Sequence, residues 1–186
     1  MEHFMKSILF ALGLGMTSAT TFAAPVATGS VHFFGNVDSG TCAIQIIDPS
    51  NGRPLSRVNM GSVNAAQFKQ ADDEAASRAF GLRLTPGAGC ILVPGVTATV
   101  TFTGKYGSAG AAGTLYALEP GGATGLALII KDNLGTPISP TVPSRQYPLH
   151  ESKPTDMLFS AAYKATSANV TAGFANADIG FSVDIP

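Results

Sequence analysis

Apolar and polar residues alternate with a period of two through most of this 186-residue chain. That period places every second side chain on one face, which is the pattern of a β-strand with one buried face. We expect strands, separated by turns rich in Gly, Pro and Asn, at residues 31–37, 42–46, 55–60, 80–84, 96–102, 126–130, 159–163 and 173–185. Seven or eight such strands are typical of an antiparallel sandwich, so the predicted fold class is all-β.

Two segments interrupt the alternation. Residues 64–79 mix alanines with Asp72, Asp73 and Glu74, a composition that fits one exposed helical turn or a polar loop, and we treat the segment as a loop. Residues 104–125 carry seven glycines and predict a flexible surface connection. A phosphate-binding loop is excluded there, because the strand–loop–helix context and the Gly-Lys-Ser/Thr ending are missing.

Residues 1–23 have the three parts of a secretory signal peptide. Lys6 supplies the positive charge, Ile8 to Met16 form a short apolar run, and Thr21 to Ala23 place small residues at positions −3 and −1 of a cleavage site. The apolar run is about half of the ~20 residues that a membrane span needs, which argues against an anchor. We therefore expect an exported protein.

Export determines how the two cysteines are interpreted. Cys42 and Cys90 are an even pair in a compartment where disulfides persist, and the pair predicts a disulfide bond. A zinc site would need further ligands, and neither His32 nor His150 lies at ligand spacing from a cysteine. On the chain-entropy model, this cross-link would stabilise the fold by roughly 4 kcal/mol.

No pattern of residues predicts catalysis, a metal site or a cofactor. His32 lies inside an alternating strand and His150 in a proline-flanked loop, and neither is accompanied by a Gly-x-Ser-x-Gly elbow. The acidic run at 72–74 is typical of a solvated face, and no calcium-loop pattern is present. Eleven scattered basic residues and a net charge of −1 give no argument for nucleic-acid binding.

The two ends of the chain carry strands that predict an unfilled place in the sandwich. One face of the closing strand consists of Gly173, Ala175, Ala177, Ile179, Phe181, Val183 and Ile185, and the sequence ends at Pro186. An apolar face this regular must be covered, and no later strand follows to cover it. One alternative is a complete sandwich, in which residues 31–37 pair with this strand within the same chain.

Several motifs together resemble a known family. They are Gly29-x-Val31-His32-Phe33-x-Gly35-x-Val37 followed by Cys42, Phe80-x-Leu82-x-Leu84 running into Cys90, Asp132-x-x-Gly135-x-Pro137-Ile138, Phe159-x-Ala161-x-Tyr163-x-Ala165-Thr166, and Val170-Thr171-Ala172-Gly173 with the closing strand. They cover almost all of residues 29–186 and resemble the type 1 fimbrial (pilin) subunits of the chaperone–usher pathway. That family places a glycine at the fourteenth position from the C-terminus, where this chain has Gly173. Its penultimate residue is usually Tyr, whereas this chain has Ile185.

The resemblance implies an immunoglobulin-like sandwich that lacks its last strand and is completed by donor-strand exchange. It divides the chain into a signal peptide (1–23), an N-terminal extension with the donor strand (24–40) and a pilin domain (41–186). The implied donor residues are Val31, Phe33, Gly35 and Val37, and the acceptor strand is the closing face from Gly173 to Ile185. Burial of three apolar donor side chains would contribute roughly 5–9 kcal/mol.

The implied function is that of a structural subunit of an adhesive fimbria, with no enzyme activity and no small-molecule cofactor. The implied partners are a periplasmic chaperone, an outer-membrane usher and neighbouring pilin subunits, at the surface of a Gram-negative cell. The alternative is a single-domain adhesive subunit that binds a host glycan or protein. A two-domain adhesin is disfavoured, because the first expected strand begins within about ten residues of the cleavage site, which leaves no room for a lectin domain.

Overall fold

The computed structural model describes residues 29–35, for which only the backbone is described, and residues 42–186. The predicted signal peptide and the predicted donor residue Val37 lie outside the described residues. The long strands are β1 (Gly29–Gly35), β2 (Ala43–Ile47), β3 (Val58–Gly61), β4 (Glu74–Thr85), β5 (Thr97–Gly104), β8 (Leu126–Asp132), β11 (Thr155–Ala165) and β12 (Ala177–Asp184). The short elements are η1 (Ala65–Gln67), β6 (Ser108–Ala109), β7 (Leu115–Tyr116), β9 (Pro137–Ile138) and β10 (Tyr147–Pro148).

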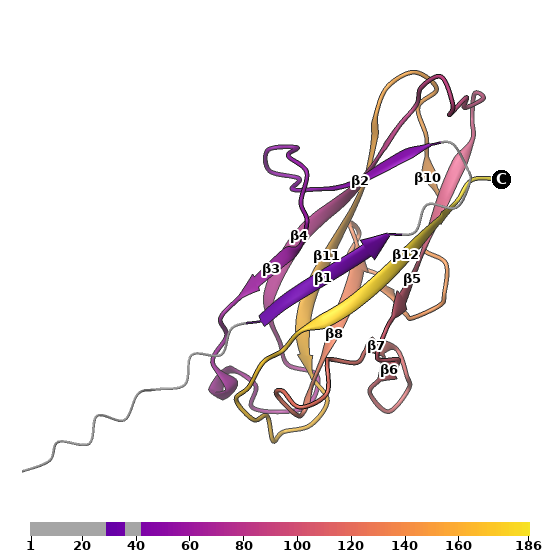
Figure 1. Ribbon diagram of the computed structural model, residues 1–186. Coiled ribbons are helices and arrows are strands. Elements are labelled where there is room, and N and C mark those ends of the chain that lie inside the picture. Colours follow the sequence, from indigo (N-terminus) through magenta and orange to yellow (C-terminus); the bar gives the residue numbers. More distant parts are fainter. Residues whose placement is uncertain (1–28, 36–41) are drawn as a thin grey trace, which may run out of the picture.

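The strands form two sheets that pack face to face (Figure 1). One sheet has the order β10-β5-β12-β1-β3, and the other has the order β2-β4-β11-β8-β7-β6 with β9 paired to β8. An all-β sandwich is therefore confirmed, and each of the eight strands expected from the alternation is present. Among residues 29–35 and 42–186, no helix is long and apolar enough to cross a bilayer.

The core lies between the two sheets and is built from the alternating residues. Phe80, Leu82 and Leu84 of β4 alternate inward and are buried, as are Ala98, Val100 and Phe102 of β5. The rings of Phe80 and Phe102 come from opposite sheets, and their centroids lie 6.2 Å apart in an edge-to-face arrangement. The period of two in the sequence thus corresponds to one buried face on each sheet.

The expected loop over residues 64–79 is wrong in its second half. η1 is a single turn, capped by the Asn64 side chain, which accepts a hydrogen bond from the Ala66 N–H. β4 then begins at Glu74, six residues before the strand expected at Phe80. Its first residues pair with the end of β11, where the register shifts between Ala161 and Tyr163. Pairing with a long neighbouring strand here outweighs the low strand propensity of alanine and acidic residues.

The glycine-rich segment 104–125 is also more ordered than the expected flexible connection. It contains the hairpin β6–β7, which extends the second sheet beside β8. Leu115 of this hairpin packs with Ala127, Ile129 and Ala162 of β8 and β11 in a second, smaller apolar cluster. Glycines at positive φ, such as Gly107 and Gly110, allow the tight turns of this hairpin.

Candidate functional site

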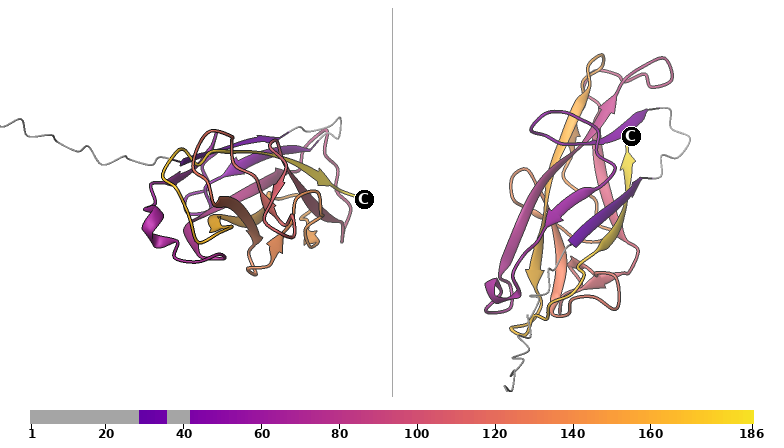
Figure 2. Two further views of the ribbon diagram at one scale, coloured as in Figure 1. Left: turned by 90° about the horizontal axis from the view of Figure 1, so that it is seen from below. Right: turned by 60° about the vertical axis from the view of Figure 1, so that its left-hand side comes forward.

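The strand β1 fills a place between β12 and β3 in the five-stranded sheet (Figures 1 and 2). It is the element that joins β3 to the rest of that sheet, because β12 pairs with β5 on its other side. Its contact with β3 covers three residue pairs and is interrupted by an irregularity between Gly29 and Ser30. The structure therefore has the cis arrangement that the sequence left open as an alternative.

The direction of β1 distinguishes it from its neighbours. It runs parallel to β12, whereas every other described strand pair is antiparallel. Parallel pairing is slightly less stable per residue than antiparallel pairing. In an otherwise antiparallel sandwich, β1 thus pairs with β12 in the less favourable direction, whereas its short contact with β3 is antiparallel.

The backbone register brings the predicted donor and acceptor residues together. Val31 pairs with Ala177, Phe33 with Ile179, and Gly35 with Phe181. Along the predicted acceptor face, Ala175, Ala177, Ile179 and Phe181 are buried, and Gly173, Val183 and Ile185 are half-buried. The residues expected to form an apolar face therefore do face the core.

A cluster of aromatic side chains lies in the core of the sandwich beside β12, the predicted acceptor strand. Phe159 of β11 stacks on Phe80 at 5.5 Å between centroids and meets Phe102 and Tyr147 edge-to-face at 5.1 and 5.4 Å. Phe181 belongs to the same apolar core as these rings. A strand added beside β12 would thus complete an apolar core and would need no polar partners for its inward residues.

On its other side, the place filled by β1 is bounded by β3. Val58 and Met60 of β3 are buried and alternate with exposed Asn59. The alternating pattern predicted this strand but did not assign it to the predicted acceptor site. The Val58/Met60 alternation was the available signal, and it was insufficient because the order of strands in a sheet is not encoded by alternation.

The start of the predicted acceptor strand, before β12, is held by a close backbone approach that requires glycine. A Cβ at Gly173 would lie 2.6 Å from the Ala123 backbone nitrogen and 2.8 Å from the Gly122 carbonyl carbon. A Cβ at Gly122 would lie 2.0 Å from the Phe174 carbonyl oxygen. The Ala123 N–H donates to that same oxygen at 2.7 Å. Gly173 therefore allows close backbone packing between two segments, and no sequence pattern marked Gly122 as its counterpart.

A buried hydroxyl holds the backbone of Ala175, two residues after Gly173. The Tyr163 hydroxyl donates to the Ala175 carbonyl oxygen at 2.7 Å, and the Tyr163 side chain is fully buried. Burial raises the pKa of Tyr163 to about 12, so the phenol stays protonated and remains a donor at physiological pH. The start of the acceptor strand is thus tied to β11 as well as to residues 122–123.

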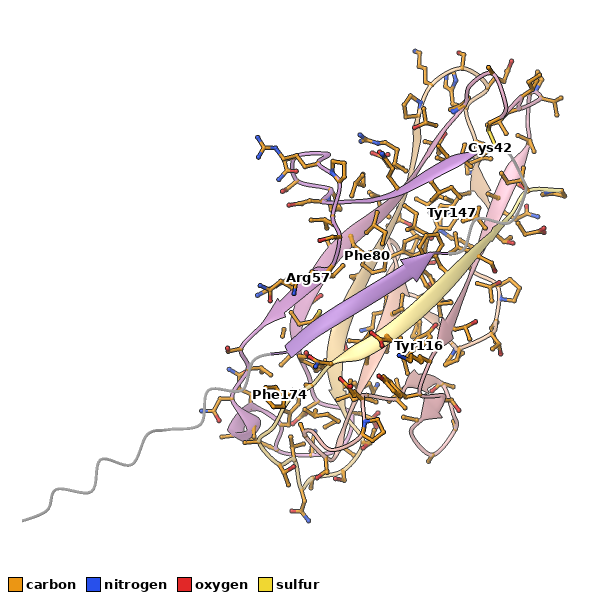
Figure 3. The ribbon with its side chains drawn as sticks, viewed as in Figure 1. Cys42, Arg57, Phe80, Tyr116, Tyr147 and Phe174 are labelled. Carbon is orange, nitrogen blue, oxygen red and sulfur yellow. A yellow bond between two sulfur atoms is a disulfide. The ribbon has the colours of Figure 1, made fainter. Side chains whose placement is uncertain are left out.

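The predicted disulfide is present at the opposite end of the sandwich. Cys42 and Cys90 are bonded, with their Cα atoms 4.5 Å apart (Figure 3). The bond joins the residue before β2 to the turn after β4, where Cys90 and Gly87 exchange backbone hydrogen bonds. Cys42 directly precedes β2, so the disulfide fixes the start of that strand.

The titratable residues considered for chemistry have ordinary structural roles. The exposed His150 accepts a hydrogen bond on Nδ1 from the Ser152 N–H. Asp72 and Glu74 form ion pairs with Lys164 on the outer face of the second sheet. Within the described part of the chain, no group of three or more His, Cys, Asp or Glu side chains could hold a metal ion.

Comparisons with known proteins agree on one family. The model of the family described as "Fimbrial protein" matches residues 31–185. The chain is 31% identical over 185 residues to a probable major fimbrial subunit, LpfA, of Escherichia coli O157:H7, with 98% of each chain covered. It is 28% identical over 184 residues to long polar fimbria protein A of Salmonella typhimurium, again with 98% of each chain covered.

Solved structures with the same fold include two proteins of this kind. An antigen and type I fimbria protein of Burkholderia pseudomallei is 32% identical, with a TM-score of 0.52 over 84% of this chain and 91% of that chain. The P pilus rod subunit PapA has a TM-score of 0.59 over 78% of this chain and 99% of that chain. At 19% identity, the second likeness concerns the fold alone.

Proposed function

Because this chain belongs to the fimbrial protein family and is a structural fimbrial subunit, not an enzyme, we propose that it polymerises by donating its N-terminal strand to a neighbouring copy. The donor residues are Val31, Phe33, Gly35 and Val37, and the acceptor strand runs from Gly173 to Ile185. The observation that supports this proposal is the place of β1 between β12 and β3. Residues 29–35 occupy that place, and in the sequence they precede the pilin domain predicted at residues 41–186.

The direction of the donor decides what assembly it builds. The C-terminal end of the donor continues into Cys42, which lies at the same end of the sandwich as the chain terminus (Figures 1 and 3). A donor parallel to its partner's β12 would leave the groove at that same end, so two copies would meet through identical ends and exchange strands reciprocally. Such a contact closes on itself and gives a dimer.

An antiparallel donor gives a different result. It leaves the groove at the start of β12, at the end opposite to the partner's Cys42. Each copy then keeps one free groove and one free donor, and the contact repeats head to tail without closing, as in an open fibre. Reversal makes the longer pairing with β12 antiparallel, which is the more stable arrangement per residue, and it makes the shorter pairing with β3 parallel. Growth of a fibre therefore requires β1 to leave its cis position and to enter the next copy in the reversed direction.

Delivery of the subunit completes the proposal. A groove between β3 and β12 without an occupant would leave an unpaired edge and an apolar core open to water, which favours aggregation. We expect a periplasmic chaperone to occupy the groove after export and signal cleavage, and an outer-membrane usher to pass the subunit to the growing fimbrium. The surface fimbrium is the site of action, where the fibre contributes to cell adhesion.

The test compares the mature chain from Ala24 with a chain that begins at Cys42 and carries residues 29–38 on a short linker after Pro186. The short linker returns the donor segment antiparallel to β12. We expect the second chain to be a monomer with a much higher unfolding midpoint, and the first chain to form multimers visible by electron microscopy. A matched control carries Phe33→Ser in the appended segment and should lose most of the gain. A mature chain that stays monomeric, with no gain from the appended strand, would contradict the proposal.

A further inference from the structure

Large apolar side chains are exposed at two opposite ends of the sandwich. After the disulfide, Ile91 and Val93 are 87% and 62% exposed, while Leu92 between them is buried. Just before β12, Phe174 is 65% exposed (Figure 3). Single exposed apolar residues are common and need no partner. These three, however, flank the two places that donor-strand exchange would bring together.

The first place is the base of the donor strand. Ile91 follows Cys90, whose bond to Cys42 fixes it beside the point where the extension leaves the domain. The loop that carries Ile91 is anchored from inside by Leu92 and by a hydrogen bond from the Val96 N–H to the Val93 carbonyl oxygen at 3.2 Å. The backbone of this loop is therefore fixed, and the side chains of Ile91 and Val93 are exposed to solvent.

The second place is the exit of the acceptor groove. Phe174 follows Gly173 at the start of the acceptor strand, where an antiparallel donor would leave the groove. Its backbone is held by the Ala123 hydrogen bond and by the close approach of Gly122. The backbone of Phe174 is therefore fixed as well, and its side chain is exposed in the folded subunit.

The length of the linking chain brings these two places close together. Between the last donor residue, Val37, and Cys42 lie five Cα–Cα steps, which span at most about 18 Å when fully extended. With Val37 in the partner's groove near the start of β12, Cys42 of the donor subunit must lie within that distance. The disulfide then carries Ile91 and Val93 to the same junction as the partner's Phe174 side chain.

We propose that in the assembled fibre Ile91 and Val93 of one subunit pack against Phe174 of the next copy, forming a second apolar contact beside the exchanged strand. This inference rests on the proposed antiparallel donor-strand exchange. The occupant of each apolar site is a second copy of this chain, because the linker length places it there. Burial of these side chains adds contact area that the donor strand alone does not supply, and it restrains the angle between successive subunits.

Disulfide trapping in the assembled fibre tests the contact. The double variant Ile91→Cys with Phe174→Cys should give a ladder of covalent oligomers after oxidation and denaturation without reductant. Within one subunit the two positions lie at opposite ends, so each cross-link joins two copies. The matched control pairs Ile91→Cys with Leu134→Cys, a 73% exposed position on the turn after β8, and should give no ladder.

The outcomes separate this inference from the function on which it rests. Wild-type fibres with no ladder from the Ile91/Phe174 pair, or with an equal ladder from the control pair, would overturn the contact and leave polymerisation intact. Failure of the wild-type chain to assemble at all would overturn both. A ladder specific to the Ile91/Phe174 pair supports the contact.

A second measurement avoids added cysteines. Phe174→Ser should leave the unfolding midpoint of the monomer nearly unchanged, because the side chain is exposed there. The same substitution should accelerate disassembly of preformed fibres in guanidinium by about tenfold, since a side chain buried only in the fibre is lost. Disassembly at the wild-type rate would contradict the contact.

Discussion

Replacing Gly173 by alanine tests whether the start of the acceptor strand depends on its close approach to residues 122 and 123. The added Cβ would meet backbone atoms at 2.6 and 2.8 Å, and backbone atoms cannot rotate away as a flexible side chain would. The two segments must therefore separate, which costs about 1–3 kcal/mol for overpacking. Separation also lengthens or breaks the 2.7 Å hydrogen bond from the Ala123 N–H to the Phe174 carbonyl oxygen, worth about 1 kcal/mol. We expect a total loss of about 2–4 kcal/mol.

Urea unfolding of the monomeric chain that carries residues 29–38 after Pro186, followed by circular dichroism, measures this loss as a lower midpoint with an unchanged slope. Gly87→Ala is the matched control. A Cβ there would have no atom within 4 Å, so the substitution should be neutral or slightly stabilising. Gly122→Ala should be at least as damaging as Gly173→Ala, and the double variant should lose less than the sum, because either Cβ alone already separates the segments. A Gly173→Ala midpoint within error of the Gly87→Ala midpoint would refute the reasoning.

Four further predictions concern the donor, the acceptor, the disulfide and pH. Gly35→Arg should leave the subunit soluble with its chaperone but exclude it from fibres, as scored by electron microscopy; normal fibre yield would contradict the donor assignment. Phe181→Asp buries a charge in the core beside the acceptor strand, which costs several kcal/mol, and should deplete the subunit from the periplasm; wild-type levels in an immunoblot would count against this assignment. Cys42→Ser should destabilise the fold by about 2–5 kcal/mol in denaturant unfolding, and an unchanged midpoint would show that the disulfide is dispensable. Hydrogen bonds from Arg83 lower the pKa of Asp156, so the folded state gains stability above the unfolded pKa near 4 that is lost as pH falls through the folded pKa. Asp156→Asn should therefore unfold more readily than wild type at pH 7, and the difference should shrink as the pH falls below about 4; a difference that does not shrink at low pH would contradict this assignment.

The alternation of residues was sufficient to predict the strands, because burial of one face leaves a direct trace in the sequence. β12 shows this most clearly, since Ala177, Ile179 and Phe181 are all buried as its pattern predicts. The pairing of Cys42 with Cys90 was likewise predictable, because these are the chain's two cysteines.

What the sequence could not predict depends on contacts between distant segments. The extension of β4 back to Glu74 follows from its pairing with the end of β11 and runs against local propensity. The role of Gly122 depends on which loop reaches β12, and one glycine among seven in that segment carries no mark of it. The cis position of β1 and its parallel direction depend on strand order, which an alternating pattern leaves open.

The alternation at residues 31–37 keeps the same residues on one face whichever way the strand runs. That set begins and ends with valine, at Val31 and Val37, but reversal exchanges the places of Phe33 and Gly35. The parallel strand pairs Phe33 with Ile179 and Gly35 with Phe181, so a reversed strand would set the large and the small residue against different parts of β12. A free peptide of these residues, released from the tether at Cys42, would show which of the two orientations the groove itself prefers.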